Sequence, residues 1–240
     1  MNTVSVIIAA AGSGVRMQGI NKLLSPLGGM PVIAHSMRTF EEMEEVREII
    51  VSARSEEIPE IEKIAREHSI TKLAGCTPGG DTRQQSVINA LRQVNRETEL
   101  IAVHDGARPL AKSSFVRQCI KDASIFGGAI LGVPVKDTIK EVQGGLITDT
   151  PDRRRLFIAQ TPQIFKKKVY FDGVNFAREH ELDFTDDCQM AEAVGVRVAV
   201  TLSDYTNIKI TTPDDLLLAA GLLEANSRRS ESGLPQRDVK

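Results

Sequence analysis

Short apolar runs alternate with amphipathic segments along the first 135 residues of the chain. β-Branched and other apolar residues fill 4–10, 48–53, 100–104 and 129–135, with a weaker run at 71–74, and this pattern is typical of buried strands. Between these runs, apolar residues recur at helical spacing in 31–45, 57–68, 82–94 and 114–126. The alternation predicts an α/β protein with a doubly wound, mostly parallel sheet that helices cover on both faces.

The pattern changes at residue 137. Residues 137–165 show short alternating runs with a Gly144-Gly145 turn, which predicts a β-arm that projects from the α/β body. We then expect helices at 167–180 and 186–194, strands at 197–202 and 207–210, and a further helix that starts at Thr212-Pro213. Residues 1–225 are thus expected to form one domain, and the polar residues 226–240 a disordered tail.

Composition and charge exclude several classes of protein. The 240 residues are 41% hydrophobic and 26% charged, as in a soluble globular protein. The net charge of −2 excludes the basic footprint of a duplex-binding protein, so we expect no nucleic-acid partner. No apolar run approaches the roughly 20 residues that span a bilayer, so we expect no membrane partner. Three dispersed cysteines and an N-terminus without a basic segment favour the cytoplasm.

A small-residue loop follows the first strand directly. Residues 9–17 read AAAGSGVRM, and small residues at that place let backbone N–H groups approach a phosphate. The loop is not a dinucleotide fingerprint, because Met17 stands where the third glycine would fall. Arg16 and Lys22 add two cations that suit a polyphosphate. The alternative is a tight turn with two surface cations.

Two further motifs lie where strands of the predicted sheet end. Residues 79–83 (GGDTR) precede a predicted helix and could hold a base or an anion; the alternative is a capped turn with Asp81 as the N-cap. Residues 104–109 (HDGARP) end an apolar strand. Asp105 is well placed there to meet Mg²⁺ or a ribose hydroxyl, and Arg108 to meet a phosphate. The alternative is a type I turn that Asp and Pro stabilise. His104 is expected to make a structural polar contact and not to act as a base.

The remaining charged motifs lie in the second half of the chain. The arm carries Lys136 and the arginines of 153–155, of which only one needs a function, since a charge run is usually a solvated face. Residues 185–187 are typical of a helix N-cap. Lys209 is expected to be an outward side chain on a late strand. The chain has no GxSxG or HExxH motif. A glycine loop, several cations and one metal-capable carboxylate together indicate phosphoryl or nucleotidyl transfer.

With these motifs in order along it, the chain resembles the 2-C-methyl-D-erythritol 4-phosphate cytidylyltransferases of the non-mevalonate isoprenoid pathway. The matching stretches are AAAGSGVRM (9–17), NK (21–22), GGDTRQQSV (79–87), HDGARP (104–109), PVKDT (134–138), QTPQIF (160–165), TDD (185–187) and TNIKITTPDDL (206–216). The resemblance implies a Rossmann-like nucleotidyltransferase fold. It also implies that a sugar phosphate attacks the α-phosphate of CTP and releases pyrophosphate, with Mg²⁺ as cofactor.

The resemblance also implies residue roles and a dimer. Arg16, Lys22, Arg153 and Lys209 would be catalytic, with Arg16 and Lys22 at the pentacoordinate transition state. Substrate would be held by Ala10, Ala11, Gly12, Gly14, Gly80, Asp81, Ser86, Asp105, Arg108, Thr138 and Thr185, and Asp105 would also lie near the metal. The arm would exchange across a homodimer, so that Thr138 and Arg153 serve the partner's site.

Four alternatives stay open at this point. Cys188-Gln189 follows the TDD motif as in the related ribitol-5-phosphate cytidylyltransferases, whereas HDGARP and PVKDT favour methylerythritol phosphate. Arg154 or Arg155 could take the place of Arg153. A nicotinamide-dependent oxidoreductase would need the missing third glycine, and a non-catalytic nucleotide-binding module would leave the Arg16 and Lys22 pair unexplained.

Overall fold

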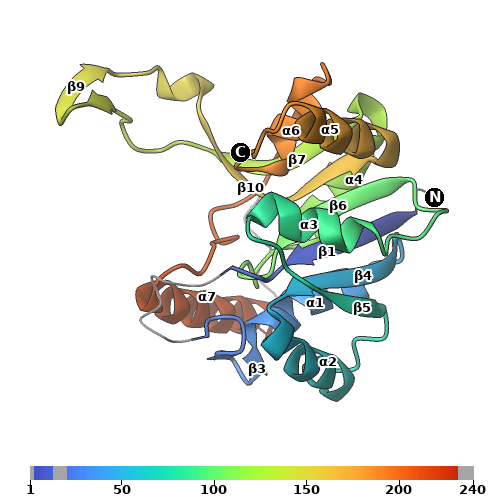
Figure 1. The fold of residues 1–240 in the computed structure, drawn as a ribbon. Helices are drawn as coiled ribbons and strands as arrows, with labels where there is room; N and C mark the ends of the chain where they lie inside the picture. The colour runs from blue at the N-terminus through green and yellow to red at the C-terminus, as the bar shows by residue number, and fades with distance from the viewer. Residues whose placement is uncertain (1–2, 13–20, 232–240) are drawn as a thin grey trace.

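The computed structural model describes residues 3–12 and 21–231, and a seven-stranded sheet is its centre (Figure 1). The sheet has the strand order β11-β7-β10-β6-β1-β4-β5. Its strands, in chain order, are β1 (Val4–Ala9), β4 (Val46–Ala53), β5 (Leu73–Pro78), β6 (Leu100–Asp105), β7 (Gly128–Pro134), β10 (Phe157–Lys166) and β11 (Ala199–Leu202). The strands expected in the first half of the chain are therefore present, and the one expected at 71–74 extends to residue 78.

The sheet is parallel except at one strand. β1 pairs in parallel with β4 and β6, so that Ile7 lies between Ile50 and Val103. β4 and β5 are also parallel, as are β7 and β11. β10 runs antiparallel to both β6 and β7. This arrangement confirms the mostly parallel α/β sheet, and it brings the carboxyl ends of β1, β4, β5 and β6 to one edge.

Helices cover both faces of the sheet, because side chains alternate across it. Val6 and Ile8 belong to a buried cluster with α1 (Val32–Glu41), α2 (Ile58–Glu67), α4 (Ser113–Phe126) and α7 (Pro213–Glu231). Ile7 points to the other face and belongs to a second cluster with α3 (Arg83–Leu91), α5 (Lys167–Glu179) and α6 (Asp187–Ala193). The doubly wound architecture is therefore confirmed.

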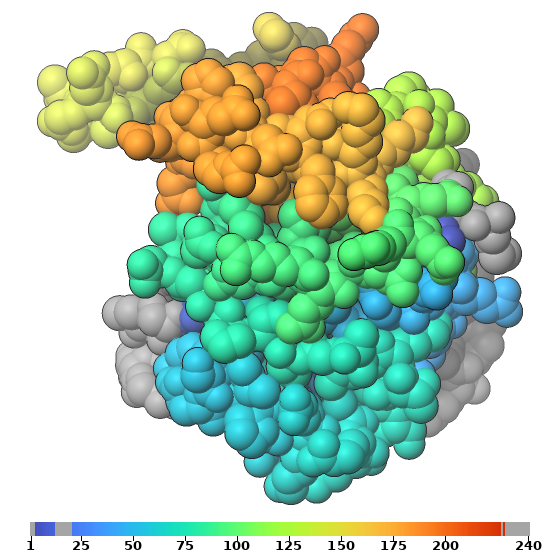
Figure 2. Space-filling view, turned by 45° about the vertical axis from the view of Figure 1, so that its right-hand side comes forward, coloured from blue at the N-terminus to red at the C-terminus, as the bar shows by residue number. Residues whose placement is uncertain are grey.

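A β-hairpin projects from this body, but it is shorter than the arm expected over 137–165. β8 (Glu141–Gln143) and β9 (Leu146–Asp149) pair only with each other, and their residues are exposed. Figures 1 and 2 show this hairpin standing away from the rest of the molecule. The projecting part ends before β10, because residues 157–166 complete the main sheet between β6 and β7. The arm therefore consists of residues 137–156.

Two other expectations differ from the structure. Residues 207–210 form no strand. Individual hydrogen bonds fix this segment in place of strand pairing, such as the bond from the Ile210 amide to the Ala107 carbonyl. Residues 226–231 continue α7, whereas they were expected in a disordered tail, and residues 232–240 lie outside the described part of the chain.

The short elements are β2 (Pro26–Leu27), β3 (Met30–Pro31), η2 (Ser55–Glu57) and η3 (Arg153–Arg155). None of the described helices is long and apolar enough to cross a membrane.

Candidate active site

A cleft opens where β1 and β6 end and α3 begins. Its cavity volume is about 480 Å³, which falls in the range of small-molecule sites. It is lined by Ala9, Ala10, Ala11, Gly12, Lys22, Leu23, Gly80, Asp81, Thr82, Arg83, Ser86, Asp105, Ala107 and Lys209. The cleft lies beyond the carboxyl ends of parallel strands, the place where open α/β sheets bind ligands.

The fold brings most of the residues singled out in the sequence into this one cleft. Segments that are far apart in the chain meet here: the loop after β1, the start of α3, the end of β6 and Lys209. The predicted residues that line the cleft are Ala10, Ala11, Gly12, Lys22, Gly80, Asp81, Ser86, Asp105 and Lys209. Gly14 and Arg16 lie outside the described residues, so their predicted place is not tested.

Hydrogen bonds hold the glycine loop before α3 in a defined shape. The Ser86 hydroxyl accepts a bond from the Gly80 amide (3.0 Å) and donates one to the Thr82 carbonyl (2.9 Å). The N-cap of α3 is Thr82, whose hydroxyl accepts from the Gln85 amide, and not Asp81. Asp81 is therefore not the cap, and it lines the cleft.

Gly79 lets this loop approach the loop after β1. A Cβ atom at Gly79 would lie 2.3 Å from the Ala11 Cβ and 3.1 Å from the Ser86 Oγ. Neither neighbour is the flexible end of a long side chain, so only glycine fits at this place. The contact joins two backbone segments that both line the cleft.

Asp105 is the centre of a group of cations. Its Oδ2 lies 2.9 Å from Lys209 Nζ and 3.5 Å from Arg108 Nε, and its Oδ1 lies 3.5 Å from Arg83 Nε. Burial alone would raise the pKa of Asp105, but Lys209, Arg83 and Arg108 together hold it well below its usual range. Asp105 is therefore ionised at neutral pH, and this one carboxylate is surrounded by three cationic side chains.

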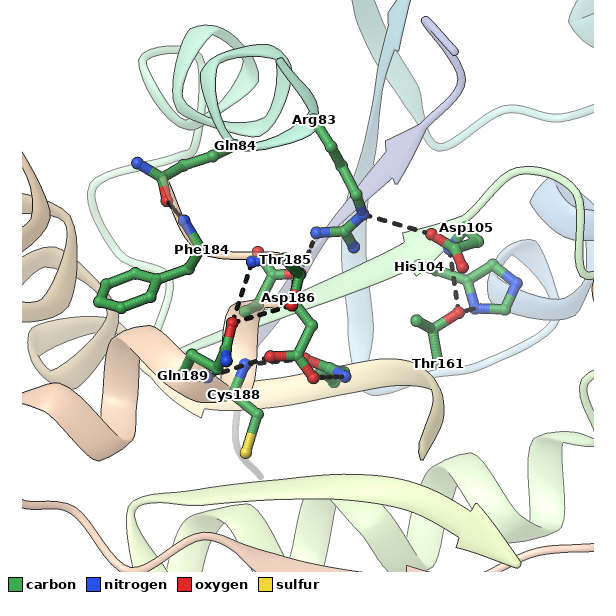
Figure 3. Close-up of polar contacts among 12 residues, drawn as sticks. Arg83, Gln84, His104, Asp105, Thr161, Phe184, Thr185, Asp186, Cys188 and Gln189 are labelled. Carbon is green, nitrogen blue, oxygen red and sulfur yellow. Dashed lines mark hydrogen bonds and ion pairs between the residues drawn. The ribbon is translucent and has the colours of Figure 1, made fainter. Parts of the chain in front are cut away.

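His104 has a structural role, as expected from the sequence. The Asp105 amide donates to Thr161 Oγ1, so the Thr161 hydroxyl proton is left for His104 Nδ1 (3.1 Å). His104 Nε2 then donates to the Arg108 carbonyl (3.1 Å). Burial lowers the pKa of His104 to about 4, so the ring is neutral. It joins the two ends of the turn after β6 through the Arg108 carbonyl, and Figure 3 shows its contact with Thr161.

Four predicted residues do not line the cleft of their own chain. Arg108 is buried beneath it and donates to the Asn207 carbonyl (2.7 Å). Thr185 precedes α6 and bonds to the Gln189 side chain. Thr138 and Arg153 belong to the arm, where Arg153 donates to the Lys136 carbonyl. Its neighbour Arg154 is paired with Asp152.

Sequence reasoning gave no role to Arg83, which lines the cleft and bridges two carboxylates. Arg83 lies near Asp105 on one side and 2.7 Å from Asp187 Oδ2 on the other. Figure 3 shows its side chain extending from α3 toward Asp105. Its position directly after Thr82, the N-cap of α3, could have indicated a role in the site. A side chain at a helix start that follows a strand lies beside the cleft at the strand ends. The second carboxylate, however, is distant in the sequence.

Comparison with known proteins identifies relatives over most of the chain. The family model for 2-C-methyl-D-erythritol 4-phosphate cytidylyltransferase matches residues 4–225. The protein of that name from Bacillus licheniformis is 41% identical, over 93% of this chain and 96% of its own. The chloroplastic protein from Oryza sativa is 39% identical, over 92% of this chain and 74% of its own.

Solved structures share the fold of this chain. The 4-diphosphocytidyl-2C-methyl-D-erythritol synthase from Anaerococcus prevotii superposes with a TM-score of 0.82 at 30% identity, covering 93% of this chain and 96% of that one. The 2-C-methyl-D-erythritol 4-phosphate cytidylyltransferase from Thermus thermophilus superposes with a TM-score of 0.75 at 29% identity, covering 93% and 100%.

Proposed function

The chain belongs to the 2-C-methyl-D-erythritol 4-phosphate cytidylyltransferase family, and from this premise we propose how its cleft performs the reaction. The enzyme joins CTP and 2-C-methyl-D-erythritol 4-phosphate to give 4-diphosphocytidyl-2-C-methyl-D-erythritol and pyrophosphate, a step of non-mevalonate isoprenoid biosynthesis. The observation that carries the proposal is the meeting of Lys22, Asp105 and Lys209 in one cleft. Cations around a triphosphate are what this reaction needs most.

The reaction is an in-line displacement at phosphorus. An oxygen of the sugar phosphate attacks the α-phosphorus of CTP, the bond from that phosphorus to the bridging oxygen breaks, and pyrophosphate leaves with the electron pair. No general base is needed, because the second pKa of a phosphate monoester is about 6 and the nucleophile is already a dianion. We assign Lys22 and Arg16 to the charge that develops on the pentacoordinate phosphorus.

The two glycine-bearing walls of the cleft suit the two ends of CTP. We assign the backbone of Ala10, Ala11, Gly12 and Gly14 to the triphosphate, because small residues leave N–H groups accessible. We assign Gly80, Asp81 and Ser86 to the cytosine. The bond from the Gly80 amide to Ser86 supports this assignment, because it fixes the loop that the base would meet.

Asp105 fits a magnesium ion that the protein and its substrate hold together. Among the described residues, no group of three or more His, Cys, Asp or Glu side chains could hold a metal. Mg²⁺ often binds through one or two carboxylates plus substrate phosphates, and Asp105 is an ionised carboxylate on the cleft wall. When bound, Mg²⁺ would neutralise phosphate charge. Lys209, 39% exposed at its side chain, lies beside Asp105 and can turn toward a phosphate.

The sugar phosphate is proposed to bind between two subunits. Lys209 and Thr185 would come from one chain, and Thr138 and Arg153 from the arm of its partner. The arm exposes Val142 (59%), Leu146 (74%) and Ile147 (64%), and such apolar side chains together mark an interaction surface. A homodimer through the arm would cover them. We also place the enzyme in the cytoplasm, consistent with its free cysteines.

A pyrophosphate-release assay tests the function directly. Purified protein is incubated with CTP and Mg²⁺ and with either 2-C-methyl-D-erythritol 4-phosphate or ribitol 5-phosphate. We expect turnover with the first acceptor, and loss of turnover when a chelator removes the metal. Faster turnover with ribitol 5-phosphate would assign the other acceptor, and CTP binding without turnover would indicate a non-catalytic module.

A further inference from the structure

A row of charged and polar side chains continues from the cleft into the buried interior. Lys209 Nζ contacts Asp105 Oδ2 at 2.9 Å, and Arg83 Nε lies 3.5 Å from Asp105 Oδ1. Arg83 then reaches Asp187 Oδ2 at 2.7 Å, and the Tyr170 hydroxyl donates to Asp187 Oδ1 at 2.6 Å. The row thus links the cleft to the start of α6 and the first turn of α5.

The inner end of this row is completely buried. Asp187 has no exposed surface, and Tyr170 is 1% exposed. A buried carboxylate is costly unless a cation and hydrogen bonds compensate it, and here Arg83 is the cation and Tyr170 the donor. Burial would lower the pKa of Arg83, but Asp187 and Asp105 raise it instead, so the guanidinium stays charged. Asp187 therefore fixes one end of Arg83 in place.

The other end of the Arg83 guanidinium lies beside Asp105 in the cleft. Lys209 and Arg108 both lie at Oδ2 of Asp105, whereas Arg83 lies at Oδ1. If a substrate phosphate draws Lys209 away, Arg83 still holds the Asp105 carboxylate at its other oxygen. The two aspartates of the motif at 185–187 therefore have different roles. Asp186 caps α6 by accepting a hydrogen bond from the Gln189 amide, and Asp187 forms an ion pair with Arg83.

We propose that Asp187 and Tyr170 are positioning residues for nucleotidyl transfer, which hold Arg83 against Asp105 and so keep Asp105 and Lys209 aligned in the cleft. The proposal rests on the proposed function, and neither residue touches the cleft itself. Figure 3 shows Arg83 directed at Asp105 from the α3 side, as this role requires. A guanidinium suits the task, because its planar array of donors can meet two carboxylates at once.

Single substitutions at both positions test the proposal. Tyr170→Phe removes only the hydroxyl and keeps the ring that packs on Phe165, so it preserves the fold even if Asp187→Asn does not. We expect kcat for pyrophosphate release to fall about tenfold in Asp187→Asn and about threefold in Tyr170→Phe, with less than about a twofold change in the Kd for CTP measured by calorimetry. Each kcat is normalised to the folded fraction from circular dichroism.

The control is Asp172→Asn, which removes the same charge from an exposed pair with Lys168 on α5. We expect wild-type kcat from this variant. Folded Tyr170→Phe and Asp187→Asn proteins with wild-type kcat would overturn the proposal and leave both residues a purely structural role. Wild-type turnover is measured in parallel, and its absence would overturn the proposed function itself rather than the role of these two residues.

A double-mutant cycle tests whether Asp187 acts through Arg83. In an Arg83→Gln background, which already lowers kcat, we expect Asp187→Asn to cause no further loss, because the group that it positions is gone. A further tenfold loss in that background would show that Asp187 acts by another route, and would overturn the proposal.

Discussion

The side chain of Asn21 donates a hydrogen bond of 2.5 Å to the carboxylate of Glu57, which is only 6% exposed at the end of η2. Asn21 also organises the turn that follows it, since its Oδ1 accepts from the Leu23 amide and its carbonyl accepts from the Ser25 hydroxyl. Lys22 lies in this turn and lines the cleft. Glu57 therefore anchors the segment that presents Lys22.

Glu57→Ala should lower both stability and activity. It leaves the Asn21 amide and Arg54 without their buried acceptor, which costs about 1–3 kcal/mol in the free energy of unfolding. We also expect kcat to fall, because the turn that carries Lys22 loses its anchor. Denaturant titration and pyrophosphate release measure the two effects. Glu56→Ala, at a neighbouring side chain 71% exposed, should change neither; an equal effect there would contradict the anchoring role.

Lys22→Ala should lower kcat far more than it raises the KM for CTP. The ammonium is assigned to charge that grows in the transition state, and the loss of one such preorganised group costs on the order of 10²-fold or more in kcat. Steady-state pyrophosphate release gives both constants. Lys63→Ala, in an exposed cluster with Glu60 and Glu67, is the control. Near-normal kcat in Lys22→Ala would refute its assigned role.

Stability should fall as the pH is lowered from about 6.5 to about 4, in part because of His104. Its pKa is lowered to about 4 in the folded protein by burial, against an ordinary value of 6.5. Between these values the unfolded chain binds a proton that the folded chain does not, so acid favours unfolding. The difference corresponds to about 3 kcal/mol by pH 4.

Denaturant titrations across this pH range measure the slope for the wild type and for His104→Gln. The amide of Gln does not titrate, so the variant should lose less stability on acidification, whatever its stability at neutral pH. Parallel slopes for the two proteins would show that His104 takes up its proton in the folded state too.

Leu146→Glu should dissociate the proposed homodimer. The side chain is 74% exposed at the tip of the arm, where a partner would cover it, so a charge there would be buried at high cost. Sedimentation should show a monomer with reduced turnover, because Thr138 and Arg153 would no longer reach a partner's cleft. A dimer that persists in Leu146→Glu would place the interface elsewhere.

Mixed dimers test whether the arm serves the partner's site. Lys22→Ala and Arg153→Ala subunits are each expected to have little activity. After mixing and exchange, half of the dimers would be mixed with one intact site each, so about a quarter of wild-type activity should return. A mixture that stays inactive would show that each chain completes its own site.

Much of the site was accessible from the sequence, because it is built at the ends of elements that local patterning predicts. Strand ends at Ala10 and Asp105 and the helix start near Gly80 could be located from apolar periodicity and glycine alone. In a parallel sheet these ends must meet at one edge. The pattern predicted Lys209 only as an outward side chain on a late strand, and its role at the site came from the resemblance. The strand does not exist, and a loop carries Lys209 to Asp105.

The sequence by itself determined most of the strands and helices, their alternation and the edge at which ligand-binding residues collect, because these follow from hydrophobic period and turn chemistry within about 15 residues. Only the tertiary structure decided which charges meet. Arg83 contacts Asp105 and Asp187, and β10 closes the sheet where an arm was expected. Such pairings join positions that are far apart in the chain, and local propensity carries no information about them.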